Sequence, residues 1–186
     1  MDLANPIKDF LQAVGARQIE IYNEFSLQHE LGLYLRNYFL GKLKVQFERN
    51  VSYFELPKLE KREIDIAITP TDSKEPLCAI ELKYPRNGQV PETMFSFCKD
   101  IAFLEQLVSS GFQSAYFLAF AEDPLFYSGK GERIYEFFRS GKPITSKINK
   151  PTGPDKDACV TINGSYTAEW NPVYNKVKYC LIQIGS

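Results

Sequence analysis

The sequence predicts a single α/β domain over residues 1–186, with helices flanking a central mixed β-sheet. Two short segments within Glu63–Lys83 alternate apolar and polar residues with period two, as half-buried strands do. A helical pattern at about residues 92–110 separates them from Ser114–Phe120, an apolar segment typical of a buried strand. Such a crossover predicts parallel pairing of the strands on either side of it. We expect the core at about residues 26–120 and a β-rich carboxy-terminal extension at about 121–186.

The composition suits an ordinary globular protein rather than a secreted, membrane-bound or strongly basic one. Of the 186 residues, 44% are apolar and 24% are charged, and the net charge is −1. No apolar run is long enough to span a bilayer and no secretion-type leader is seen, so we expect no membrane partner. The scattered cysteines favour a reducing, cytoplasmic location over a disulfide framework. They are Cys78, Cys98, Cys159 and Cys180.

Two amphipathic helices are predicted before the sheet. The first is expected at about residues 6–15, because proline is favoured in the first turn of a helix. The second is expected over Leu27–Leu40, with Ser26 as its N-cap and Gly41 as its stop. Glu30 lies at the edge of the apolar stripe of this second helix, where a carboxylate needs a partner. That partner is either a neighbouring group or a site on the sheet.

A strand and a basic loop are predicted next. The strand is expected over Lys44–Phe54, with a bulge or bend that interrupts its alternation. The loop that follows contains Lys58, Lys61 and Arg62, which are candidate contacts for phosphate groups. A loop of this composition is otherwise simply solvated.

The predicted hairpin Glu63–Lys83 carries the chemistry. Its isoleucines form one face, while Asp65 on the first strand and Glu81 and Lys83 on the second lie on the other. Two carboxylates placed so near to each other repel unless a cation lies between them. Magnesium favours such oxygen ligands, and a nearby ammonium can stabilise charge in a phosphoryl transition state. The alternative is a cross-strand ion pair on a solvated face.

This pattern resembles the signature of the restriction-endonuclease-like PD-(D/E)xK nuclease superfamily, which is Pro-Asp, a gap, then Asp/Glu-x-Lys. Here Asp65 follows Ile64 in place of proline, and Glu81-Leu82-Lys83 supplies the second half. The resemblance covers about Ser26–Phe120. It implies the α-β-β-β-α-β core of that family.

The resemblance also implies an activity. The chain would be a metal-dependent nuclease, a DNA endonuclease that uses Mg²⁺ or Mn²⁺. In this family Asp65, Glu81 and the backbone carbonyl of Leu82 would hold the metal. Lys83 would position the attacking water, and Glu30 would complete the cluster from the preceding helix. Cutting both strands of a duplex would favour a homodimer. The competing hypothesis is a catalytically inactive nucleic-acid-binding or regulatory module on the same fold.

Further nucleic-acid contacts are expected beyond the second hairpin strand. The loop after it contains Arg86, Asn87 and Gln89, whose side chains are of the kinds that contact phosphates and base edges. In the resembled family the next helix can lend one polar residue to the site. Lys99 is the matching candidate here.

The last third of the chain predicts a short helix, a loop and further strands. The helix is expected over Arg133–Arg139 and a polar surface loop over Lys142–Asp157. Asn163-Gly164 predicts the turn of a hairpin. Lys178–Ile184 is expected as a closing strand. These strands either extend the sheet or form a small subdomain.

Overall fold

The computed structural model describes residues 4–57, 59, 61–86, 88–153 and 157–185, and it is an α/β fold as predicted. A six-stranded mixed sheet has the order β1-β2-β3-β4-β8-β7, and β5 and β6 form a separate two-stranded sheet. In chain order the elements are α1 (Ala4–Gly15), α2 (Glu24–Phe39), β1 (Leu43–Asn50), η1 (Val51–Phe54), β2 (Glu63–Pro70), β3 (Cys78–Lys83), α3 (Val90–Ser109), β4 (Ser114–Ala121), η2 (Pro124–Phe126), α4 (Tyr135–Arg139), β5 (Ile144–Asn149), β6 (Cys159–Tyr166), β7 (Trp170–Tyr174) and β8 (Val177–Ile184).

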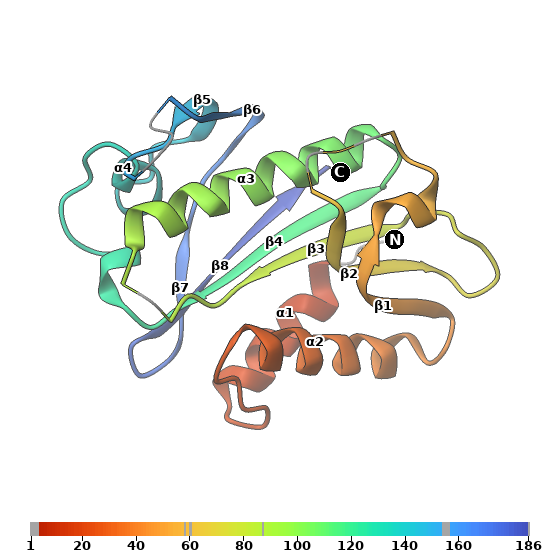
Figure 1. The fold of residues 1–186 in the computed structure, drawn as a ribbon. Helices are drawn as coiled ribbons and strands as arrows, with labels where there is room; N and C mark the ends of the chain where they lie inside the picture. The colour runs from red at the N-terminus through yellow and green to blue at the C-terminus, as the bar shows by residue number, and fades with distance from the viewer. Residues whose placement is uncertain (1–3, 58, 60, 87, 154–156, 186) are drawn as a thin grey trace.

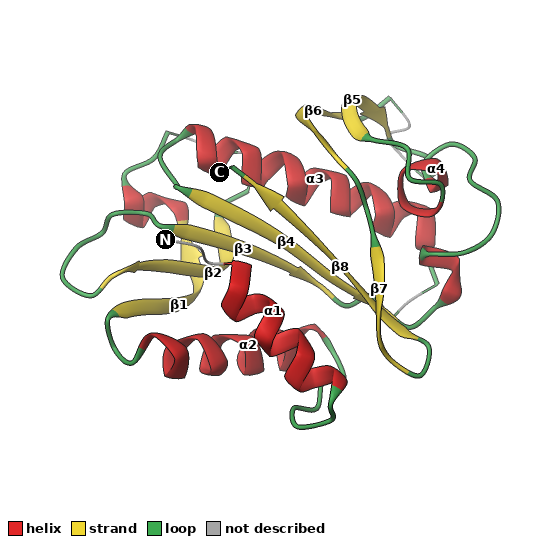
Figure 2. Ribbon diagram, turned by 180° about the vertical axis from the view of Figure 1, so that it is seen from behind, coloured by secondary structure: helices red, strands yellow, loops and turns green. Residues whose placement is uncertain are grey.

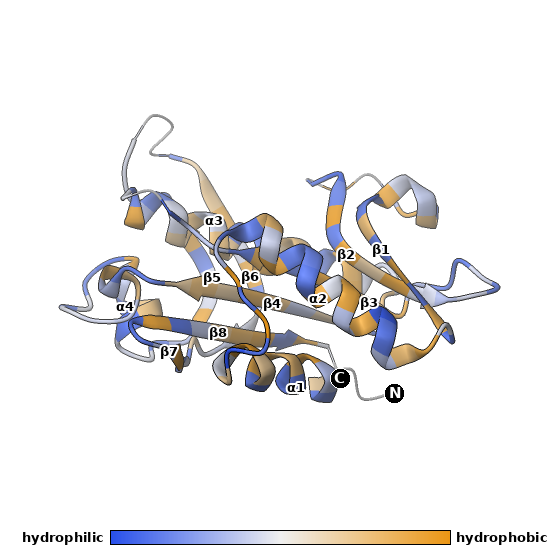
Figure 3. Ribbon diagram, turned by 90° about the horizontal axis from the view of Figure 1, so that it is seen from below, coloured by the Kyte–Doolittle hydropathy of each residue, from blue (hydrophilic) through white to orange (hydrophobic). Residues whose placement is uncertain are grey.

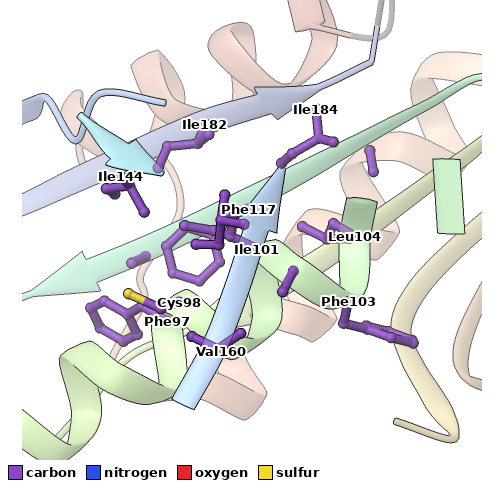
Figure 4. Packing of buried hydrophobic residues seen from close by; sticks show 14 of the residues in the cluster. Phe97, Cys98, Ile101, Phe103, Leu104, Phe117, Ile144, Val160, Ile182 and Ile184 are labelled. Carbon is purple, nitrogen blue, oxygen red and sulfur yellow. The ribbon is translucent and has the colours of Figure 1, made fainter. Parts of the chain in front are cut away.

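The sheet lies between two helical layers. Helices α1 and α2 cover one face, and α3 crosses the other (Figure 1). Strands β3 and β4, which precede and follow α3 in the chain, pair in parallel, and this confirms the predicted crossover. Apolar side chains fill both interfaces, with Phe97 and Ile101 of α3 packing near Phe117 of β4 (Figure 4). Strand β4 is hydrophobic along its length, as expected for a strand buried on both faces (Figure 3).

Helix α2 begins three residues earlier than predicted. Its N-cap is Asn23, whose side chain accepts a hydrogen bond from the backbone N–H of Ser26 at 2.7 Å. The hydroxyl of Ser26 in turn accepts from the backbone N–H of Asn23 at 3.0 Å, so Ser26 completes a capping box instead of being the cap. The early start places Glu24 in the first turn of the helix.

Strand β1 is shorter than the predicted segment. It ends at Asn50, where the side chain of Asn50 accepts from the backbone N–H of Ser52 at 3.0 Å and starts the 3₁₀ turn η1. The chain then turns away from the sheet and returns through the basic loop to β2. This detour brings the end of that loop beside the start of β2.

The carboxy-terminal strands divide between the two predicted alternatives. Strands β7 and β8 extend the main sheet beside β4, whereas β5 and β6 form a separate hairpin near α3 (Figure 2). Strand β5 occupies part of the predicted polar loop 142–157, so that prediction is wrong there. The chain contains no helix, within the described ranges, of the length and apolarity that crossing a membrane needs.

The predicted turn at Asn163-Gly164 is also wrong, because both residues lie inside β6. Neither has the positive φ that a two-residue hairpin turn of that type requires. The close packing around position 164 suits glycine instead. A Cβ there would lie 3.0 Å from the Oε1 atom of Glu105 and closer still to the hydroxyl of Tyr166.

Candidate active site

The hairpin β2–β3 places Asp65 beside Glu81. The two strands pair antiparallel, with Ile66 opposite Ile80, and continuing this register brings Asp65 opposite Glu81. At this pair, hydrogen bonds made by the two side chains replace the hydrogen bonds between the strand backbones. The Asp65 carboxylate accepts a hydrogen bond from the backbone N–H of Leu82 at 2.7 Å, and Glu81 accepts from the backbone N–H of Asp65 at 3.4 Å. Both carboxylates are therefore fixed to the sheet by backbone donors.

Helix α3 contributes a third carboxylate, Asp100, which was not predicted as a site residue. Its Oδ2 atom lies 3.1 Å from the Nζ atom of Lys83, and its side chain is 9% exposed. The predicted contributor from this helix, Lys99, is exposed and its Nζ atom lies 5.7 Å from the centre of the Phe95 ring. A signal was present, because Asp100 follows Phe97 by three residues and so interrupts the apolar stripe of the helix.

A second lysine lies among these carboxylates. The Nζ atom of Lys61 contacts Oε2 of Glu81, and it lies 3.2 Å from Oδ1 of Asp100 and 4.0 Å from Oδ1 of Asp65. Lys61 reaches the site from the loop before β2. From the sequence, Lys61 is only one cation of a basic loop, because nothing in a loop sequence fixes where its side chains end.

Helix α2 brings Glu24 to the site rather than Glu30. The Oε2 atom of Glu24 accepts from the backbone N–H of Tyr84 at 2.9 Å, and its Oε1 atom lies 3.9 Å from the Nζ atom of Lys83. Glu30 is half-exposed, and no ion pair or hydrogen bond among the described residues joins it to this cluster. Gln28 contacts β2 instead, donating to the backbone carbonyl of Asp65 at 2.9 Å.

The electrostatics follow from burial and charge density. Burial raises the pKa of Glu81 well above its usual range, and the neighbouring Asp65 and Asp100 raise it further while Lys61 opposes them. Burial likewise raises the pKa of Asp65, against the pull of both lysines. For Lys61, burial alone would lower the pKa, but the three carboxylates outweigh it and the pKa rises. Lys83 has the same balance and also a raised pKa.

The oxygen atoms of the cluster are of the chemical type that a hard divalent cation prefers, but their present arrangement is not that of a metal site. Asp65, Glu81 and the carbonyl oxygen of Leu82 are the oxygen ligands that magnesium prefers. In the structure, however, the Leu82 carbonyl accepts from the Nζ atom of Lys83 at 2.9 Å, and Lys61 lies between the carboxylates. Across the described part of the chain, no three His, Cys, Asp or Glu side chains are placed to hold one metal ion.

Three of the predicted nucleic-acid contacts, Arg62, Arg86 and Gln89, lie on the surface. Arg86 is exposed, donates to the backbone carbonyl of Tyr22 at 2.9 Å and lies 3.7 Å from Glu122. Arg62 and Gln89 are also exposed, and Gln89 precedes the first turn of α3. Lys58 and Asn87 fall outside the described residues. These positions leave the expected role in nucleic-acid binding as a prediction.

Comparison of the chain with protein-family models, with curated proteins and with solved structures finds no match.

Proposed function

We propose that this chain is a metal-dependent nuclease of the restriction-endonuclease-like type, which hydrolyses phosphodiester bonds in DNA. The observation that supports it is the buried cluster in which Asp65, Glu81 and Lys83 meet on one face of the hairpin. Clustered ionisable groups with shifted pKa values are characteristic of active sites. The order α2-β1-β2-β3-α3-β4 supports the same proposal, since it matches the core of that superfamily.

In this proposal the negatively charged residues bind the metal ion and the positively charged Lys83 acts on the water and the phosphate. Asp65, Glu81 and the Leu82 carbonyl would hold Mg²⁺ or Mn²⁺, which supplies Lewis-acid stabilisation of charge on the phosphodiester when bound. Lys83 is only 19% exposed and is held by Asp100 at 3.1 Å, so its ammonium is positioned with little freedom. From there Lys83 orients the attacking water and stabilises negative charge on a phosphate oxygen. Asp100 and Glu24 position Lys83.

A second candidate is a catalytically silent nucleic-acid-binding or regulatory module on the same fold. The observation that favours it is the pairing of Lys61 with Glu81 and Asp100, which compensates the carboxylates without any metal. A module of this kind needs the cluster only for stability. It would bind nucleic acid with no dependence on divalent cations.

Cleavage assays with paired variants separate the two candidates. Supercoiled plasmid, linear duplex and single-stranded DNA are incubated with Mg²⁺ or Mn²⁺ and wild-type protein, Asp65→Ala or Lys83→Ala. We expect each variant to lose activity by on the order of 10²-fold or more, because each removes a group that acts on the reacting phosphate. Thermal melting establishes that the variants remain folded.

The matched control is Asp72→Ala, which removes an exposed carboxylate from the turn of the same hairpin. It should cleave like the wild type. An Asp65→Ala variant that retains full cleavage would overturn the proposed site. Metal-independent DNA binding without cleavage by the wild type would favour the silent module.

A further inference from the structure

Lys61 lies where the carboxylates of the cluster converge. Its Nζ atom is within 4.0 Å of oxygen atoms of Asp65, Glu81 and Asp100. Glu81 is fully buried, and among the described residues Lys61 is its only ion-pair partner. A buried carboxylate next to two others needs such a compensating cation. Lys61 therefore supplies, in the structure, the charge that the proposed function assigns to a metal ion.

We propose that Lys61 is an internal competitor of the divalent metal, whose ammonium must leave the carboxylates before the metal binds. The inference depends on the proposed metal-dependent function and concerns the regulation of the same site. It makes metal occupancy conditional on displacing one side chain. The protein would then hold a charge-compensated, metal-free state at low metal concentration.

The two lysines of the site differ in how easily they can leave. Lys83 extends from a central strand and is 19% exposed, with hydrogen-bond or ion-pair contacts to the Leu82 carbonyl, Asp100 and Glu24. Lys61 extends from the loop before β2 and is 35% exposed. Its Nζ atom lies 5.6 Å from the centre of the Phe103 ring, so the ring covers the ammonium on one side. A long, flexible side chain in a loop can swing into water without moving the sheet.

The electrostatic consequence has two parts that oppose each other. Removing the charge of Lys61 leaves Glu81 without its ion-pair partner, so the metal-free protein should lose stability. The same removal makes the cluster more negative and eliminates the competing cation, so a divalent ion should bind more tightly. Metal should therefore stabilise the variant more than it stabilises the wild type.

Metal titrations on matched variants test this directly. Mn²⁺ binding is measured by calorimetry and by the loss of the free-ion electron paramagnetic resonance signal, with wild type, Lys61→Met and Lys61→Arg. Lys61→Met keeps most of the apolar stem without the charge, whereas Lys61→Arg keeps the charge. We expect Lys61→Met to bind Mn²⁺ at least about tenfold more tightly than wild type, and Lys61→Arg to show no such gain. Melting with and without Mn²⁺ should show the larger upward shift in Lys61→Met.

The control for net charge is Lys74→Met, which removes an exposed lysine from the turn of the β2–β3 hairpin. It should bind Mn²⁺ like the wild type. If Lys61→Met does not fold without metal, Lys61→Gln replaces it, with a neutral polar group that can still donate to the carboxylates. The same increase in affinity is expected for this variant.

The outcomes distinguish this inference from the proposed function. If wild type binds Mn²⁺, Asp65→Ala abolishes binding and Lys61→Met binds no more tightly than wild type, competition by Lys61 is wrong while the metal site stands. If neither wild type nor Lys61→Met binds Mn²⁺ at millimolar concentration, the metal-dependent function and this inference both fail.

Discussion

Helix α3 carries two buried carboxylates, Asp100 and Glu105, that lie little more than one turn apart but have opposite surroundings. Glu105 accepts hydrogen bonds from the backbone N–H groups of Asn163 at 2.9 Å and Gly164 at 2.6 Å. The hydroxyl of Tyr166 donates a further bond at 3.0 Å. All these donors are neutral, and they join α3 to strand β6.

Asp100 has cations and other carboxylates around it instead. Its two oxygen atoms face Lys61 at 3.2 Å and Lys83 at 3.1 Å, and Asp65 and Glu81 lie across from it. Each charge in this cluster is balanced only through the others. Removing one group changes the electrostatic environment of the rest.

The contrast separates a carboxylate that joins two parts of the fold from one that belongs to the proposed active site. The hydrogen-bonding capacity of Glu105 is satisfied by neutral donors of the protein itself. These hydrogen bonds link the separate β5–β6 sheet to the main domain. The cluster around Asp100 concentrates like charges, which is costly for folding and is usually kept for chemistry.

The largest expected effect on stability is at Glu105. Glu105→Ala should lower the free energy of unfolding by about 2–3 kcal/mol, because it leaves two backbone N–H groups and the Tyr166 hydroxyl without their acceptor. Urea denaturation with a constant m-value measures this loss. Glu169→Ala, which removes an exposed carboxylate between β6 and β7, should have little effect. A loss as small as that of the control would show that Glu105 does not hold the two sheets together.

The hairpin site could be predicted from the sequence because its signal is local. Period-two alternation fixes which residues of β2 and β3 share a face, and Asp65, Glu81 and Lys83 follow from that phase. Asp100 carried a weaker local signal, as a charged residue within an apolar stripe. Lys61 carried none, because the loop that holds it is positioned by the whole fold.

Errors elsewhere arose where distant groups decide local structure. Asn163-Gly164 has the composition of a tight turn, but its N–H groups donate to Glu105, 58 residues earlier in the chain, and the strand continues. At the start of α2, the N-cap is Asn23 and not the predicted Ser26, and Ser26 instead completes the capping box. The predicted start at Leu27 put Glu24 outside the helix, and Glu30 was predicted because it lies at the edge of the apolar stripe.

The next prediction concerns the pH dependence of stability at Glu81. Because the pKa of Glu81 is raised in the folded state, between the unfolded pKa of about 4.5 and the folded pKa the folded state holds a proton that the unfolded state has released. Above the folded pKa, Glu81 is ionised and paired with Lys61. Stability from this group therefore falls as pH rises, up to the folded pKa. Glu81→Gln cannot titrate, so its stability relative to wild type should increase by about 1.4 kcal/mol per pH unit within that window.

Thermal or urea unfolding at a series of pH values from about 4 to 8 checks this slope. Glu63→Gln, at the exposed start of β2, corrects for the loss of one surface charge. A flat difference between Glu81→Gln and wild type would mean that Lys61 keeps Glu81 ionised throughout. The cluster would then behave as a stable ion pair, and its contrast with Glu105 would weaken.

The smallest expected effect is at Glu24, on the rim of the cluster. Its side chain is 46% exposed and its pairing with Lys83 spans 3.9 Å, so Glu24→Gln should lower stability by only about 0.5 kcal/mol. Glutamine keeps an acceptor for the backbone N–H of Tyr84, and Lys83 keeps Asp100. The loss should disappear in high salt, because only the ionic part of the contact changes. A larger, salt-independent loss would place Glu24 with Glu105 as a structural carboxylate. A small, screened loss together with weaker cleavage would instead place it with the groups that position Lys83.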